Sequence, residues 1–309
     1  MGPLFFVCRG SQKMSKRFFR QSKEKLIEAI LLLAASSSIF ITMGIVGILV
    51  YESVQFFREV SFFDFITDTQ WTPLFENPHY GILPLLSGTL TTTFVALCVA
   101  IPLGTIAAIF LSEYASHRLR EIVKPLLELL SAVPTVVYGY FALLFVTPLL
   151  QKIFPDLPGF NMLSAGLVIG IMIIPYVSSV SEDAIHSVPM YLREGSYAMG
   201  ATKMQTALKV VMPSAISGIA AAYILGISRA VGETMVVAIA AGMQPNFTFN
   251  PTQPAETITA YIVQVSLGDL PHGGLGYRTI FAAGLSLLSM TLVFNIIGHW
   301  LRKKYREVY

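Results

Sequence analysis

The sequence predicts an all-α membrane protein with six transmembrane helices. Of its 309 residues, 54% are apolar and only 13% are charged, whereas a soluble domain is about 25% charged. Six stretches are each long and apolar enough for a membrane-spanning helix, which needs about 20 residues. The composition also excludes a disordered chain, and a net charge of only +3 argues against a nucleic-acid-binding protein.

The six expected helices cover residues 26–51, 82–111, 126–150, 162–180, 215–241 and 279–301. Prolines inside several of them predict kinks, because neighbouring helices in lipid satisfy the backbone groups that a proline frees. The first stretch follows a basic segment but is longer than the apolar part of a signal peptide, which has about 7–15 residues. We therefore expect it to remain in the protein as a membrane helix.

The positions of the basic residues predict the orientation of the chain. Of the 21 lysines and arginines, 17 lie in segments 1–25, 112–125, 181–214 and 302–309. Segments rich in Lys and Arg remain in the cytoplasm, so both termini are predicted to be cytoplasmic. The chain then consists of a basic tail (1–25), an additional N-terminal helix (26–51), an extracytoplasmic loop (52–81), a membrane core (82–301) with a second extracytoplasmic loop (242–278), and a basic tail (302–309).

The chain lacks the motifs of common membrane enzymes. It has no G-x-x-x-x-G-K-[ST] loop for nucleotide phosphates, no H-E-x-x-H zinc motif and no C-x-x-C pair. The five histidines have no metal-ligand spacing, and the two cysteines, Cys8 and Cys98, provide no disulfide framework. We therefore expect no catalytic residue, no metal site and no cofactor bound by this chain.

The 181–214 loop is too long and too patterned for a simple connection. Its apolar residues recur at helical spacing, which predicts short helices along the cytoplasmic face. These helices are expected to be interrupted near Gly200 and to end at Pro213. Small residues in its first half leave a surface that another protein approaches closely. An ordinary amphipathic helix at the membrane interface is the alternative interpretation.

Two charged residues, Arg229 and Glu233, lie in the expected fifth helix, with Arg229 close to its midpoint. A charge at the centre of the bilayer costs about 3 kcal/mol on insertion scales. On a helix, side chains four residues apart are close enough to pair, so the two are predicted to face a protein interior or a wet cavity. This position favours a polar element of a solute path over a purely structural ion pair.

Further positions suggest a gate and an outer surface. The Pro134-Thr135 step and Pro175 are possible hinges of a gate, although ordinary kinks are the alternative for each alone. The 52–81 loop is rich in aromatic residues, which predicts a helix at the membrane interface that packs on the bundle. The apolar stretch 258–267 is expected to be a re-entrant or outer helix. Docking of a binding protein to these loops stays an open alternative.

The spacing in the cytoplasmic loop resembles the EAA loop of ABC-importer permeases. The matching positions are Glu194, Gly195, Ser196, Gly200, Val210 and Pro213. The string Ser228 to Met235, with Arg229, Gly232, Glu233 and Thr234, is similar to the R-A-x-G-E-T motif of phosphate-importer permeases. Met235 after that motif is typical of the PstC subunit family rather than the paralogous PstA family. The resemblance covers about residues 40–309.

The resemblance implies the type I ABC-importer permease (MetI-like) fold, with one extra helix before a five-helix core. It also implies a transport subunit of the bacterial plasma (inner) membrane that forms half of a translocation path for inorganic phosphate. The implied partners are a PstA-like permease subunit, two copies of a PstB-like ATPase subunit that binds ATP-Mg, and an extracytoplasmic PstS-like binding protein, besides membrane lipid. Arg229, Glu233 and Thr234 would line the path, and the EAA-like residues would contact the ATPase.

Two other functions remain open at the level of the sequence. The first is a permease for another oxyanion, such as molybdate, sulfate or phosphonate, because the planar arginine fork matches any such anion. The second is a stand-alone, ion-coupled secondary transporter. Such transporters often contain inverted repeats with broken helices, and no convincing internal repeat is present here.

Overall fold

The computed structural model describes residues 4–268, 271 and 273–304, with side chains from residue 23 onward. The chain divides into two units, Met1–Glu52 and Ser53–Tyr309. The described residues of the first unit form one continuous helix, the N-terminal part of α1 (Leu4–Glu59). The side chain of Cys8 and the last five residues, which include Arg306 of the expected C-terminal tail, lie outside the described residues.

Helix α1 is longer than the expected helix 26–51, because it includes most of the basic tail and ends eight residues later. The reason is that no proline occurs between Leu4 and Glu59, so nothing in the covalent structure ends the helix. The candidate membrane span within this helix begins at Lys23, close to the expected start at residue 26.

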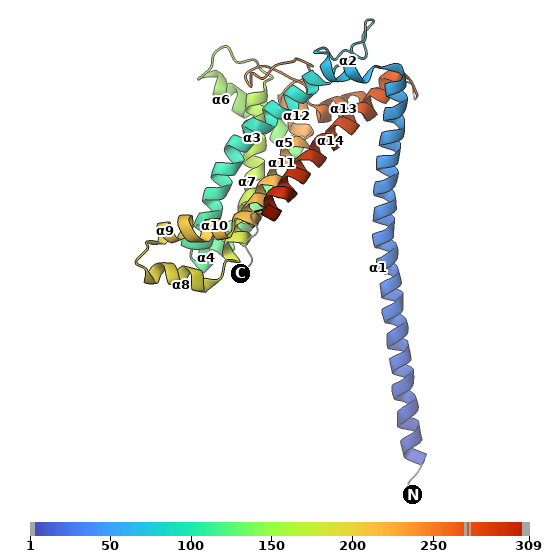
Figure 1. The fold of residues 1–309 in the computed structure, drawn as a ribbon, viewed down its shortest axis with the longest axis vertical. Coiled ribbons are helices and arrows are strands. Elements are labelled where there is room, and N and C mark those ends of the chain that lie inside the picture. Colours follow the sequence, from blue (N-terminus) through green and yellow to red (C-terminus); the bar gives the residue numbers. More distant parts are fainter. Residues whose placement is uncertain (1–3, 269–270, 272, 305–309) are drawn as a thin grey trace. The chain divides into compact units, whose positions relative to one another are not determined.

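The described residues of the second unit are helical and contain no strand (Figure 1). Its first half consists of α2 (Phe62–Thr67), α3 (Leu83–Ile109), η1 (Phe110–Tyr114), α4 (His117–Ala132), α5 (Thr135–Phe141), η2 (Ala142–Val146), α6 (Thr147–Gln151) and α7 (Met162–His186). Its second half consists of α8 (Met190–Ala198), α9 (Lys203–Thr206), η3 (Ala207–Val211), α10 (Met212–Ser214), α11 (Ile216–Val231), α12 (Met235–Ala240), α13 (Ile258–Ser266) and α14 (Leu275–Lys304). The η segments are short π-helical turns.

Among the described residues, four helices are each long and apolar enough to cross a membrane: Lys23–Glu59, Leu83–Tyr114, Met162–His186 and Leu275–Lys304. Two more spans are present only if a sharply bent pair of helices counts as one span. These pairs are His117–Ala132 with Thr135–Gln151, bent by 86°, and Lys203–Ser214 with Ile216–Val231, bent by 75°. The predicted number of six is therefore reached with both bent pairs included.

The expected third span, 126–150, is not one kinked helix. It breaks between α4 and α5 at Val133 and Pro134, and Val133 has an extended backbone with ψ of 130°. Proline lacks an N–H and disfavours helical geometry in the residue before it, so the chain turns sharply here. The Tyr138 hydroxyl donates a hydrogen bond across the break to the carbonyl of Leu130, at 2.6 Å.

The expected fifth span, 215–241, is also interrupted. Helix α11 ends at Val231 with Gly232 as its cap, and α12 begins at Met235. Glycine is a poor helix former, and the Glu233 carboxylate accepts a hydrogen bond from the N–H of Val236 at 3.4 Å. This bond satisfies a donor of the first turn of α12, where a helix has no partner of its own.

Helix α7 lies at the centre of the second unit and contacts α3 and α11 along its length (Figure 1). Small residues permit this packing. A side chain at Gly170 would lie 2.7 Å from the carbonyl oxygen of Ala96 in α3, and one at Gly226 in α11 would lie 3.1 Å from Val177. Pro175 lies inside α7 without interrupting it. The packing of α7 against α3 and α11 therefore includes close backbone approach at glycines, besides the buried apolar side chains of the core.

The end of the second unit that carries α2 and α13, here called the outer end, has an aromatic core. Phe56, Phe65 and Trp71 are buried there against Tyr261 of α13, which agrees with the predicted packing of the 52–81 loop. His79 lies 2.9 Å from the Asp68 carboxylate in this loop. Burial alone would raise the pKa of Asp68, but the hydrogen bonds from His79 and from the backbone N–H of Gln70 outweigh it and lower the pKa.

Candidate functional site

The break between α11 and α12 positions the Glu233 side chain. Glu233 is 3% exposed, and its carboxylate is held by the Val236 N–H of the next helix. Its backbone carbonyl accepts a hydrogen bond from the hydroxyl of Thr259 in α13, at 2.7 Å. Glu233 is therefore held by two other elements, its carboxylate by α12 and its backbone by α13, rather than by a continuous helix.

Arg229 is less firmly held than Glu233. Its Nη2 atom lies 3.7 Å from the Glu233 carboxylate, which is an ion pair without a direct hydrogen bond. The guanidinium carbon lies 5.9 Å from the ring centre of Tyr176 in α7, within the range of a cation–π contact. The side chain is 38% exposed, and its Nε atom has no hydrogen-bond partner within the described part of the chain. The Nε atom is buried, so the part of the guanidinium that is available to another acceptor is its exposed part.

The predicted path and hinge residues come together in the middle of the bundle. Thr234 is half-buried beside Glu233, and its hydroxyl donates to the carbonyl of Gly232. A side chain at Gly139 in α5 would lie 3.2 Å from the carbonyl oxygen of Met235, so α5 packs against the start of α12. The break at Pro134-Thr135 therefore lies near the break that holds Glu233. Pro175 precedes Tyr176, the aromatic partner of Arg229, which the sequence did not reveal.

The EAA-like residues form a separate surface at the other end of the second unit, here called the coupling end, which carries α8 and α9 (Figure 1). Glu194, Gly195 and Gly200 are exposed, and Pro213 is exposed where η3 leads into α10. Ser196 and Val210 are half-buried, and the Ser196 hydroxyl lies 2.9 Å from that of Thr206. The predicted short helices with a break near Gly200 are present.

Gly200 has a specific backbone role in this surface. Its φ angle is +83°, a conformation that only glycine adopts at little cost. The chain then enters α9 through a capping box, in which the Thr202 hydroxyl accepts the N–H of Gln205 and the Gln205 side chain accepts the N–H of Thr202. Glycine and capping box together set the turn between α8 and α9.

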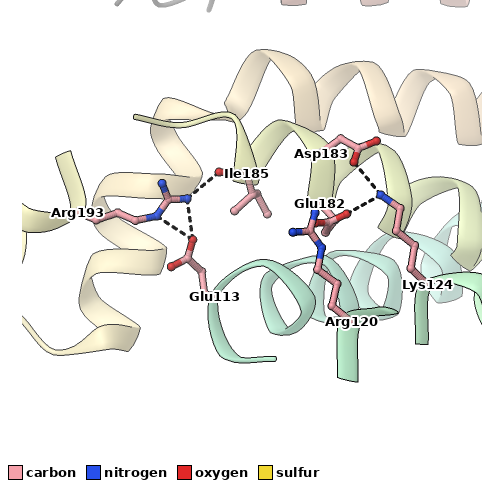
Figure 2. Close-up of polar contacts among 7 residues, drawn as sticks. All are labelled: Glu113, Arg120, Lys124, Glu182, Asp183, Ile185 and Arg193. Carbon is pink, nitrogen blue, oxygen red and sulfur yellow. Dashed lines mark hydrogen bonds and ion pairs between the residues drawn. The ribbon is translucent and has the colours of Figure 1, made fainter. Parts of the chain in front are cut away.

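Buried ion pairs connect the helices of the coupling end to one another (Figure 2). Arg193 of α8 binds Glu113 of η1, with Nη2 2.9 Å from the carboxylate. Glu182 of α7 is fully buried and contacts both Arg120 and Lys124 of α4. In the sequence, these basic residues indicated only the orientation of the chain. Their partners are acidic residues at the ends of expected spans, a signal that was present in a chain with few charges.

Within the described residues, no three His, Cys, Asp or Glu side chains are grouped so that they could hold a metal ion. The arrangement instead offers a half-exposed arginine with a buried carboxylate inside a helical bundle, and an exposed helix pair at one end. Such an arrangement is suited to passage of an anion and to docking of another protein.

Comparison with known proteins identifies the family. Residues 100–307 match the model of the family described as the inner membrane component of binding-protein-dependent transport systems. The chain belongs to this family. It is therefore a multi-pass membrane permease, a transport component rather than an enzyme, as predicted.

Relatives and solved structures agree with this assignment. The permease is 34% identical to the probable ABC transporter permease protein YqgH of Bacillus subtilis, over 89% of this chain and 88% of that one. It is 30% identical to the phosphate transport system permease protein PstC of Haemophilus influenzae, over 96% of both chains. A chain of a bacterial alginate ABC transporter, solved in complex with a periplasmic protein, shares the fold with a TM-score of 0.63 at 19% identity, over 93% of this chain and 97% of that one. The predicted ABC-importer permease fold is confirmed.

Proposed function

We propose that this permease forms half of the translocation path for inorganic phosphate in an ATP-driven importer. The observation that carries the proposal is the Arg229 guanidinium, which is half-exposed and lies beside the buried Glu233. A planar guanidinium fork matches the oxygens of a tetrahedral oxyanion. The relatives named as phosphate transport permeases support phosphate as that anion.

The Glu233 carboxylate supports phosphate over sulfate on chemical grounds. Hydrogenphosphate carries a proton that it can donate to a carboxylate, whereas sulfate at neutral pH has only acceptors. Glu233 lies 3.7 Å from Arg229, so one phosphate can contact both side chains. Phosphate would then bind weakly enough to leave, because the arginine keeps its interaction with Glu233 and Tyr176.

The two ends of the second unit fit the partners of such an importer. We place the coupling end, with Glu194, Gly195, Ser196, Gly200, Val210 and Pro213, against a PstB-like ATPase subunit that binds ATP-Mg. Two copies of that subunit would drive this chain together with a PstA-like second permease. A PstS-like binding protein would deliver phosphate at the outer end. Both termini would face the cytoplasm of a bacterial cell, with the protein in the inner membrane.

Replacement of Glu233 by Gln tests the proposal. We expect the Glu233→Gln variant to lose most phosphate uptake, because a glutamine amide accepts the phosphate proton less well than a carboxylate. The variant should discriminate less between phosphate and sulfate than the wild type does. Labelled phosphate and sulfate uptake into membrane vesicles measures both effects. Unchanged phosphate uptake in a normally assembled complex would exclude a direct role of Glu233.

A permease for another oxyanion is the second candidate, because Arg229 alone fits sulfate, molybdate or phosphonate equally well. Competition during the uptake assay separates these substrates. A stand-alone secondary transporter is the third, and it would show uptake without any ATPase subunit and no ATPase in material purified with the permease.

A further inference from the structure

We propose that Arg193 is a positioning residue: it transmits movement of α8, at the coupling end, to the membrane helices α3 and α7. This proposal rests on the proposed function, because it assumes that an ATPase subunit moves α8. It concerns a residue outside the substrate path and adjacent to the exposed EAA-like positions. Four observations support it.

The first observation is the burial of Arg193. It is 8% exposed and is the buried residue of α8, whose other residues are half-buried or exposed. A surface helix is ordinarily held by an apolar stripe, whereas the residue that α8 buries most deeply is a guanidinium, with Leu192 packed beside it. A buried charge is stable only while its charged and hydrogen-bonding partners stay in place. The guanidinium therefore fixes the position of α8 relative to its partners more tightly than an apolar contact would.

The second observation is that one guanidinium joins three elements (Figure 2). Its Nε and Nη2 atoms lie 3.2 Å and 2.9 Å from Oε1 of Glu113, in the turn that continues α3. Nη2 also donates to the carbonyl of Ile185 at 2.8 Å, and Nη1 donates to the carbonyl of Val188. These carbonyls lie at the C-terminal end of α7, where helix carbonyls lack internal partners and carry partial negative charge.

The third observation is the burial of Glu113, whose side chain is 4% exposed. A movement of α8 that left η1 behind would therefore separate two buried, opposite charges, and such a separation is strongly unfavourable. The same movement would also remove the guanidinium from the end of α7. A movement in which η1 and the end of α7 shift together with α8 costs less free energy, because the ion pair stays intact.

The fourth observation is that α7 leads from the Arg193 contacts to the candidate path. Tyr176 of α7 contacts Arg229, and Gly170 and Gly104 hold α7 and α3 in close packing. Glu182 of α7, three residues before Ile185, binds Arg120 and Lys124 of α4. The end of α7 is therefore attached both to α8 and to α4, the helix that precedes the Pro134 break.

The Arg193→Lys variant tests the proposal in the complete importer reconstituted in lipid vesicles. Lysine keeps the charge but loses the planar fork that joins three elements. We expect the ATPase subunits to co-purify in normal amounts, while phosphate uptake per ATP hydrolysed falls about tenfold. Stimulation of ATP hydrolysis by phosphate-loaded binding protein should fall to the same extent. A purely structural role would lower the amount of complex without changing this ratio.

Glu113→Gln is the second variant, since it removes the charge from the partner while keeping its size. We expect it to have the same effect, and the double variant to be no worse than either single one, because both remove one interaction. The control is Arg278→Lys. Arg278 forms an ion pair with Glu59 at the outer end, with Nη1 2.6 Å from the carboxylate. This variant should leave the ratio of uptake to hydrolysis unchanged.

Three outcomes would overturn the proposal. They are an unchanged uptake-to-hydrolysis ratio in Arg193→Lys and Glu113→Gln, loss of the ATPase subunits from both variants, and independent, additive effects of the two substitutions. Failure of the proposed function is distinguishable, because the wild-type complex would then hydrolyse ATP or bind its partners without importing phosphate.

Discussion

Arg229 is the residue on which, in the proposed function, selection of an anion depends. It has an ion pair to Glu233, a ring contact to Tyr176 and an unpaired Nε within the described residues. A lysine at this position would keep the charge but present one ammonium group instead of a fork. Arg229→Lys should therefore reduce phosphate uptake about tenfold, the equivalent of one charge-assisted hydrogen bond.

Uptake of labelled phosphate by the Arg229→Lys variant, at equal amounts of assembled complex, measures this effect. The control is Lys209→Arg, an exposed position at the coupling end, where the opposite exchange should have no effect. Equal uptake by Arg229→Lys and the wild type would show that the fork does not contact the anion.

Glu256 has a different chemical role at the outer end, between α12 and α13. It is 2% exposed, and its Oε1 atom has no hydrogen-bond partner within the described residues. Burial raises the pKa of this carboxyl from 4.5 to about 8. Between these values the unfolded chain has lost the proton while the folded protein keeps it. The free energy of unfolding should therefore fall as pH rises through this window, by about 1 kcal/mol per pH unit.

The Glu256→Gln variant should lack this pH dependence, because glutamine stays neutral. Thermal unfolding of the purified protein at about pH 5 and about pH 8 measures it, since both values lie near the limits of the window. The variant should gain stability relative to the wild type mainly at the higher pH. The exposed carboxylate of Glu76 provides the control, Glu76→Gln. An identical pH profile for Glu256→Gln and the wild type would contradict a neutral buried carboxyl.

At the scale of elements, close backbone contact between α3 and the segment before α13 depends on Gly88. A side chain here would lie 2.3 Å from the carbonyl oxygen of Glu256, so one of the two backbones must move. Gly88→Ala should therefore destabilise the protein by about 1–3 kcal/mol, the usual cost of an overpacked site. Thermal unfolding of the purified variant measures the loss.

Gly195→Ala is the matched control for Gly88→Ala. Gly195 also lies within a helix, α8, but a side chain there would meet nothing within 4 Å. Alanine favours a helix over glycine by about 1 kcal/mol, so the control should be neutral or slightly stabilising. A Gly88→Ala variant as stable as the wild type would show that the two segments approach less closely than the structure indicates.

The elements also show where sequence reasoning succeeded. Apolar length located five of the six spans within a few residues at one end or both, and the glycine and proline positions predicted the broken helices of the 181–214 loop. The fifth candidate span is instead the bent pair Lys203–Ser214 and Ile216–Val231, which begins and ends at least ten residues before the expected 215–241. A hinge or kink was predicted at Pro134-Thr135, but not a bend of 86°, and the interruption between α11 and α12 at Gly232–Thr234 was not predicted. Average hydropathy reports how apolar a segment is but not how its backbone bends. It therefore cannot distinguish one kinked span from two helices bent by 86°.

The same limit applies to individual contacts. The pair of Arg229 and Glu233 was predicted from spacing on one helix, but the structure brings them together across a helix end, with Glu233 held by Val236 and Thr259. Tyr176 and Glu113 were missed as arginine partners because they are distant in sequence. Such contacts depend on how α7 and α3 pack, which the local sequence does not specify.

At the scale of the whole molecule, α7 joins the coupling end of the second unit to the proposed path residues. The coupling end carries exposed EAA-like residues over buried ion pairs, and the path residues lie about 20 Å further along α11, at a rise of 1.5 Å per residue. Movement at one end can therefore change the surroundings of Arg229 without any direct contact between the two sites. This arrangement accounts for a transport subunit that has no ATP-binding motif of its own.

The most direct test of this account is uptake of labelled phosphate into vesicles that contain this permease, its second permease and the ATPase subunits. We predict that uptake requires both ATP inside the cytoplasmic compartment and the phosphate-loaded binding protein outside. An excess of sulfate or molybdate should leave it unchanged. Uptake that continues without ATP or the binding protein, or that sulfate abolishes, would contradict a phosphate importer driven by ATP.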